Sequence, residues 1–166
     1  MAYAARSGIT TVENLMVPLY IAHGETDVRV PSEHAVRYME KAQELGISES
    51  VVFHGNVSNV VDKVATSDIY ISSSDYEGIS NSMLEALAMG VPSICTDCAG
   101  GGARLAIEND VNGLLVRCGD TDNFADAMAR IADNAAFARR MSEAAIESSA
   151  RFAPSTIYAQ WLGALL

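Results

Sequence analysis

The chain has 166 residues, of which 49% are hydrophobic and 19% charged, and its formal net charge is −10. This length and composition predict one globular domain with a buried core and exclude a disordered or fibrous protein. An acidic chain with only two lysines lacks the basic stripe that nucleic-acid binding requires. We therefore expect neither nucleic acid nor an anionic membrane surface as a partner.

Strands and helices are predicted to alternate along the chain. Apolar runs and helical spacing predict a strand at residues 17–22, a helix at 31–45, a strand at 51–53, a helix at 57–66, a strand at 69–72, a helix at 80–89, strands at 91–95 and 113–116, and helices near 124–131, 135–150 and 155–166. This order predicts an α/β fold with a parallel sheet covered on both faces by helices. Ligands of such sheets bind beyond the carboxyl ends of the strands, so the candidate site loops are 23–30, 54–58, 73–81 and 96–104.

The sequence contains few signals that indicate a cellular location. The longest uninterrupted apolar run is too short to span a bilayer, and the N-terminus lacks the apolar core of a signal peptide. Three cysteines are too few for a disulfide scaffold. We expect a cytoplasmic chain with reduced thiols. The spacing of Cys95 and Cys98 also fits half of a zinc site or a redox pair, but buried small side chains explain it as well.

The loop after the third predicted strand is the strongest candidate site. It is polar, it contains a glycine, and it leads directly into a helix, whose free N–H groups favour a phosphate. Glu77 lies at the tip of this loop. Glu85 lies inside the helix, and its carboxylate leans toward the helix start, where it suits sugar or ribose hydroxyls. The alternative is a capping box formed by Ser82 and Glu85, with Glu77 merely solvated.

Residues 77–92 resemble the E-x(7)-E signature of the group 1 family of retaining, sugar-nucleotide-dependent glycosyltransferases with the GT-B fold. Further segments at residues 51–57, 65–69, 96–104 and 109–116 are similar to motifs of the same family. The resemblance covers residues 18–166. It implies a Rossmann-like parallel sheet with helices on both faces, which is the C-terminal half of a GT-B fold. It also implies synthesis of surface polysaccharides from a nucleotide sugar.

The resemblance implies a role for each matching residue. Glu85 would hold the ribose hydroxyls of the donor, and Glu77 would lie near the transferred sugar as the catalytic residue. Other donor contacts are implied for the turn of Gly55, Asn56 and Val57 at the base, and for Gly78, Ile79, Ser80 and Asn81 at the sugar and diphosphate. Secondary candidates are His23, Gly24, His54 and Arg104, although a surface arginine is the favoured explanation of Arg104. The expected donor is a uridine diphosphate (UDP) sugar, with no cofactor and no metal.

Departures from the family pattern predict a partial enzyme. A GT-B enzyme has two Rossmann-like domains, and residues 1–166 match only the donor-binding one, with residues 1–16 as a poorly matched leader. The first strand and a cationic pair for the diphosphate are absent from the match. We therefore expect a single domain that is inactive alone, lacks the N-terminal acceptor-binding domain, and self-associates through the apolar face of its last helix. The alternatives are a non-catalytic sugar-nucleotide-binding module and half of a sugar-nucleotide epimerase.

Overall fold

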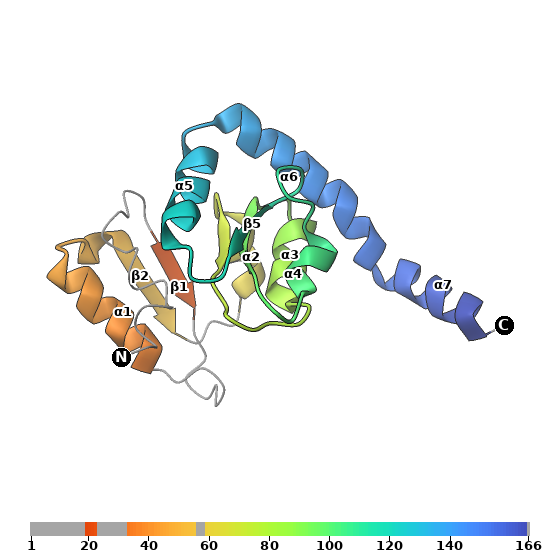
Figure 1. Cartoon of the computed structure of the whole chain (residues 1–166), viewed down its shortest axis with the longest axis horizontal. Helices are drawn as coiled ribbons and strands as arrows, with labels where there is room; N and C mark the ends of the chain where they lie inside the picture. The colour runs from red at the N-terminus through yellow and green to blue at the C-terminus, as the bar shows by residue number, and fades with distance from the viewer. Residues whose placement is uncertain (1–18, 23–32, 56–58, 166) are drawn as a thin grey trace. The chain divides into compact units, whose positions relative to one another are not determined.

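The computed structural model describes residues 19–22, 33–55 and 59–165. The chain forms two compact units, residues 1–60 and 61–166, and each is described by itself. Strands and helices alternate in both units (Figure 1). No helix in the described ranges has both the length and the apolarity needed to cross a membrane.

The first unit is built around a parallel pair of strands. Strand β1 (Leu19–Ala22) pairs with β2 (Val51–Gly55), with Leu19 opposite Val51. Between them lie α1 (Glu33–Glu44) and the 3-10 helix η3 (Ser48–Ser50). The positive φ of Gly46, +69°, lets the chain leave α1, as is common for a glycine just beyond a helix.

The second unit contains a parallel sheet in the order β3 (Tyr70–Ser72), β4 (Ser93–Asp97), β5 (Leu114–Arg117). In its register Ile71 lies opposite Ile94, which in turn lies opposite Leu114. The remaining elements are α2 (Val60–Ala65), α3 (Asn81–Ala88), α4 (Gly102–Ala106), α5 (Thr121–Ala132), α6 (Ala135–Ser149), η4 (Ala150–Phe152) and α7 (Pro154–Leu165).

Two hydrophobic clusters show that helices cover both faces of this sheet. Neighbouring residues of a strand point to opposite faces, so Cys95 and Ile94 of β4 belong to different clusters. The Cys95 cluster includes Met83 and Leu87 of α3 together with α4 residues. The Ile94 cluster contains Phe124 and other α5 residues. Helix α6 contributes to both, which confirms the expected architecture.

Two differences from the sequence prediction lie around β4. Helix α4 was not predicted, because its segment was interpreted as part of a glycine-rich loop; three of its five residues are buried against the sheet. Strand β4 begins at Ser93 rather than Val91, because the Val91 N–H still bonds to Ala86 O at the end of α3. Predicted residues 17–18, 31–32, 57–58 and 166 lie outside the described residues.

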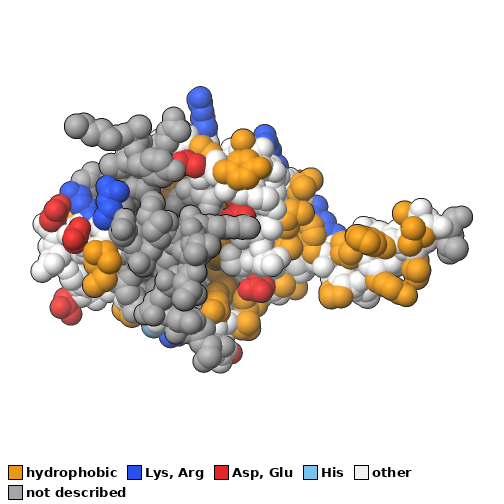
Figure 2. Space-filling model, turned by 90° about the horizontal axis from the view of Figure 1, so that it is seen from below, with side chains coloured by type: hydrophobic (Ala, Val, Ile, Leu, Met, Phe, Trp, Pro, Cys, Tyr) orange, Lys and Arg blue, Asp and Glu red, His pale blue; other side chains and the backbone are white. Residues whose placement is uncertain are grey.

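None of the described residues of helix α7 is buried. Tyr158, Trp161 and Leu165 are 67%, 70% and 79% exposed. Hydrophobic side chains run along the helix (Figure 2). The helix contains no charged residue that would compensate for this apolar exposure.

Candidate functional site

The loop between β3 and α3, residues 73–80, ends in a well-defined helix cap. Ser80 is the N-cap: its backbone is extended, its Oγ accepts a 3.4 Å hydrogen bond from Met83 N, and its carbonyl accepts one from Leu84 N at 3.1 Å. Ser82 does not cap the helix. Its Oγ instead lies 2.8 Å from the Tyr70 hydroxyl and 2.9 Å from Ser80 Oγ. The capping box of Ser82 with Glu85 is therefore wrong.

Burial of Tyr70 supports its hydrogen bond with Ser82. It raises the pKa of Tyr70, so the phenol keeps its proton and remains a hydrogen-bonding group for Ser82. The cap is thus tied to β3 as well as to the first turn of α3.

The β3–α3 loop leaves backbone donors open at the start of α3. No described residue accepts a hydrogen bond from the N–H of Gly78, Ile79, Ser80, Asn81 or Ser82. These groups lie at the positive end of the helix dipole. A Cβ placed on Gly78 would have nothing within 4 Å, so this side of the loop is open. The arrangement can receive an anion.

Both predicted carboxylates are exposed on the same loop and helix. Glu77 lies in the loop, and Glu85 lies on the outer side of α3, opposite the buried Met83 and Leu87. Neither forms an ion pair with a described basic residue. The two side chains are therefore available to accept hydrogen bonds from hydroxyl groups.

The inner side of the β3–α3 loop packs on the segment that follows β4. A Cβ on Gly100 would lie 2.0 Å from Glu77 O, and one on Gly102 would lie 1.7 Å from Gly78 O. Only glycine permits these approaches. Thr96 Oγ1 donates a hydrogen bond to Ser74 O, and Cys98 Sγ donates one to Glu77 O over 3.6 Å.

Arg104 is the only basic residue between Lys63 and Arg117 in the sequence. Its Nε lies 2.9 Å from Asp97 Oδ1, in an ion pair that lacks the alignment of a hydrogen bond. Its guanidinium also donates to Cys98 O at 3.3 Å. Arg104 is therefore held by the end of β4 and the residue after it, although its side chain is 54% exposed.

Cys95 and Cys98 are both buried. Burial, together with the neighbouring Cys98, raises the pKa of Cys95 to about 12. The described residues contain no group of three or more His, Cys, Asp or Glu side chains that could hold a metal ion. Cys95 instead packs in the hydrophobic cluster beneath α3.

The remaining predicted site residues belong to the first unit. His54 is half-buried on β2, and Gly55 ends that strand. His23, Gly24, Asn56 and Val57 lie outside the described residues. The structure thus brings together Glu77, Gly78, Ile79, Ser80, Asn81 and Glu85, with Arg104 in the neighbouring segment. Sequence reasoning placed Thr96 and Cys98 in the candidate loop 96–104 but gave them no role in donor binding, because their contacts with the β3–α3 loop depend on the fold.

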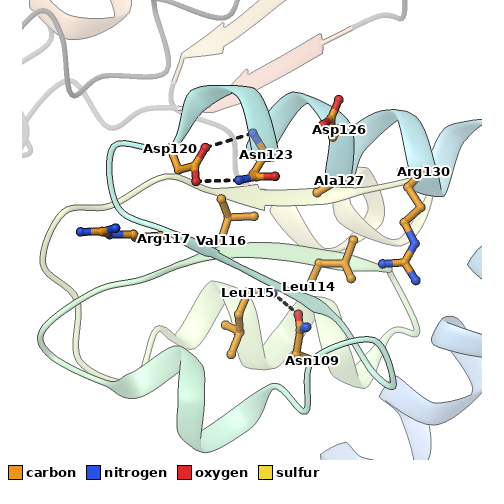
Figure 3. A pocket seen from close by; sticks show the side chains of 10 residues that line it. All are labelled: Asn109, Leu114, Leu115, Val116, Arg117, Asp120, Asn123, Asp126, Ala127 and Arg130. Atoms are coloured by element: carbon orange, nitrogen blue, oxygen red, sulfur yellow. Dashed lines mark hydrogen bonds between the residues drawn. The ribbon is translucent and has the colours of Figure 1, made fainter.

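A separate pocket of about 320 Å³ lies between β5 and α5. Its lining contains none of the predicted site residues: Asn109, Leu114, Leu115, Val116, Arg117, Asp120, Asn123, Asp126, Ala127 and Arg130. Figure 3 shows that Asp120 bonds to Asn123 at the start of α5 and that Asn109 bonds to Leu115 N. Arg130 pairs with Asp110. These polar groups are engaged in local structure, so the pocket is not assigned as the site.

Comparison with known proteins shows the family of the chain. Residues 10–134 match the family model described as glycosyl transferases group 1. The chain is 35% identical over 120 residues to an exopolysaccharide phosphotransferase of Streptomyces coelicolor, covering 72% of this chain and 13% of that protein. It is 32% identical over 102 residues to the lipopolysaccharide core biosynthesis glycosyltransferase LpsE of Rhizobium meliloti, covering 61% of this chain and 29% of that protein.

A solved structure extends the likeness over nearly the whole chain. HepE of Anabaena, crystallised in complex with UDP, superposes with a TM-score of 0.82 at 21% identity, covering 95% of this chain and 43% of that one. This likeness confirms the expected α/β fold as part of a GT-B architecture. The chain spans less than half the length of each of these relatives.

Proposed function

The chain belongs to the group 1 glycosyl transferases, and on that basis we propose that its second unit binds the diphosphate sugar end of a nucleotide-sugar donor. The donor class is a UDP-sugar. The reaction of the whole enzyme is transfer of the sugar, with retention of configuration, to a glycan or lipid-linked acceptor in surface polysaccharide synthesis. Glu77 is the proposed catalytic residue, and Gly78, Ile79, Ser80, Asn81 and Glu85 are the proposed donor contacts.

The open backbone donors at the start of α3 carry this proposal. Departure of a nucleoside diphosphate builds up negative charge, which oriented N–H groups stabilise without a metal ion. Glu85 accepts hydrogen bonds from the ribose hydroxyls, and Glu77 lies beside the transferred sugar. Because Asp97 engages Arg104, backbone donors rather than a cation make the main phosphate contact in this unit.

Two observations on relatives support the choice of donor and product. HepE was solved with UDP bound. One sequence relative is named an exopolysaccharide phosphotransferase, and the other a lipopolysaccharide core biosynthesis glycosyltransferase. The base would contact the turn of Gly55, Asn56 and Val57, with His23, Gly24 and His54 on the same side.

We further propose that residues 1–166 form one donor-binding domain and that the acceptor binds to a further N-terminal domain. The partial coverage of each relative supports this division. The chain alone is then expected to bind donor without transferring sugar. The exposed apolar side chains of α7 are expected to drive self-association when that domain is absent.

Titration of the isotope-labelled chain with UDP and guanosine diphosphate, followed by amide NMR, tests the proposal. We expect UDP to shift the amides of residues 78–85, and Glu85→Ala to weaken binding on the order of tenfold, as loss of hydrogen bonds to a charged group does. Glu143→Ala removes an exposed carboxylate on α6 and serves as the matched control. The absence of shifts at millimolar UDP, or equal affinity of Glu85→Ala and the wild type, would overturn the proposal.

A donor-binding module without any transfer activity is the second candidate, favoured by the engagement of Arg104 with Asp97. Joining the chain to an acceptor-binding domain separates the two functions. Transfer of labelled sugar that is lost in Glu77→Gln supports the enzyme, whereas UDP binding without transfer in the joined protein supports the module.

A further inference from the structure

We propose that the end of β4 and the segment after it set the backbone conformation of the β3–α3 loop, and that Thr96, in the strand, and Cys98, just beyond it, are positioning residues for donor binding. This inference rests on the proposed function, because it explains how the open N–H groups are aimed at a diphosphate. The two segments follow neighbouring parallel strands, so their contacts lie at the carboxyl end of the sheet.

Hydrogen bonds from the ends of β4 and β5 fix two carbonyl groups of the loop. Cys98 Sγ lies 3.6 Å from Glu77 O. Thr96 Oγ1 and Cys118 Sγ both reach Ser74 O, the latter at 3.9 Å. Loops are usually free to rotate such peptide groups, and here buried or half-buried donors hold them.

Because a peptide group is planar, the hydrogen bond to the Glu77 carbonyl also fixes the direction of the Gly78 N–H. Glu77 C=O and Gly78 N–H belong to the same planar trans peptide, in which the two bonds point in opposite directions. When Cys98 holds the carbonyl against the β4 side, the Gly78 N–H must point away from it. No described residue accepts a hydrogen bond from that N–H.

Gly100 keeps this peptide close to the β4 segment, and Gly102 does the same for the next peptide, between Gly78 and Ile79. Any Cβ on Gly100 or Gly102 would overlap the peptide atoms of Glu77 or Gly78, at 2.0 Å and 1.7 Å. On the other side, a Cβ on Gly78 would meet nothing within 4 Å. The loop is therefore supported on one side and open on the other. Such preorganised donors bind a ligand without a further ordering cost.

Two cysteines of the same strand end provide a matched test. Cys98 is 2% and Cys95 is 3% exposed, but of the two thiols only that of Cys98 donates to the loop among the described contacts. We expect Cys98→Ala to shift the Gly78 amide resonance, speed its hydrogen exchange, and weaken UDP binding by about two- to fivefold, because a thiol forms only a weak hydrogen bond. Cys95→Ala is expected to leave the Gly78 amide and the UDP affinity unchanged.

A second pair tests the threonine contact. Thr96→Val keeps the shape of the side chain but removes the hydroxyl, and we expect it to weaken UDP binding. Thr96→Ser restores a hydroxyl and is expected to restore the affinity. Gly102→Ala is expected to displace the Gly78 peptide most, whereas Gly163→Ala, with nothing near its Cβ, is the control.

An unchanged Gly78 amide and UDP affinity in Cys98→Ala would overturn this inference while leaving the proposed function intact. Equal effects of Cys98→Ala and Cys95→Ala on the Gly78 amide would overturn it as well, because they would indicate a general loss of packing. A wild-type chain that does not bind UDP would overturn the proposed function instead, and the donor-binding part of the inference with it.

Discussion

Helices α3 and α7 have similar apolar sequences but opposite surroundings. The shorter helix, α3, has 8 residues and buries Met83, Ala86 and Leu87. The longer one, α7, has 12 residues and buries none, and hydrophobic side chains lie along its surface (Figure 2). Trp161, for example, is 70% exposed. Apolar content therefore does not decide burial in this chain. What α3 has, and α7 lacks, is a sheet beneath it, and that support holds the candidate site in place.

The largest expected difference between the two helices is the cost of removing a leucine. Leu87 is fully buried, and Leu87→Ala should lower the free energy of unfolding by about 2–5 kcal/mol because it leaves a cavity. Leu165→Ala on α7 is the matched control and should change it by no more than about 0.5 kcal/mol, because that side chain is 79% exposed. Urea unfolding measures both. Similar losses from the two variants would contradict the comparison.

Alkaline pH should also destabilise the core beneath α3. Burial, and then the neighbouring Cys98, raises the pKa of Cys95 from 9.0 to about 12. Between these values the unfolded chain has lost the proton that the folded chain keeps. Stability is therefore fully present below pH 9 and falls as the pH rises toward 12, by at most about 1.4 kcal/mol per pH unit from this group.

Urea unfolding at a series of pH values measures this loss. In Cys95→Ala the decline above pH 9 should be shallower than in the wild type. Trp161→Ala on α7 provides the comparison and should leave the slope unchanged, since it lies outside the Cys95 cluster. Parallel pH profiles of Cys95→Ala and the wild type would rule out Cys95 as the source.

Helix capping gives a smaller and more local difference. Ser80→Ala removes the hydroxyl that accepts the Met83 N–H, and we expect it to lower the free energy of unfolding by about 0.5–2 kcal/mol. Ser155→Ala, in the first turn of α7, is the control. Ser80→Asp keeps a capping group but adds negative charge at the helix start. It should therefore restore stability while weakening UDP binding, and unchanged UDP affinity would count against phosphate at this position.

Local pattern was sufficient to predict α3 and the loop before it. The helical spacing after residue 80, the closing Gly90 and the polar loop with Gly78 all act within a few residues of one another. The family resemblance then marked Glu77 and Glu85. Both carboxylates are exposed, Glu77 on the loop and Glu85 on the outer side of the helix, and their roles toward a donor stay predictions.

What the sequence did not predict depends on which segments meet in space. The packing of Gly100 and Gly102 on the Glu77 and Gly78 peptide requires that β3 and β4 be neighbours. The pairing of Arg104 with Asp97 arises because helix α4 brings Arg104 back over the end of β4. Ser80 and Ser82 both suit a helix cap by residue type, and the contact with Tyr70 decides between them.

The smallest expected effect on stability is the one that most sharply separates the two helices. Trp161→Ala removes the largest side chain of α7, yet it should change the free energy of unfolding by no more than about 0.5 kcal/mol, because no described neighbour buries it. The effect of Trp161→Ala should appear in self-association instead. Sedimentation velocity at rising concentration should show self-association of the wild type and less of it in Trp161→Ala, with Gln160→Ala as the control. If the wild type stays monomeric at high concentration, the apolar face of α7 does not bind a second copy. If Trp161→Ala unfolds as readily as Leu87→Ala, the helix is buried in solution and the contrast with α3 fails.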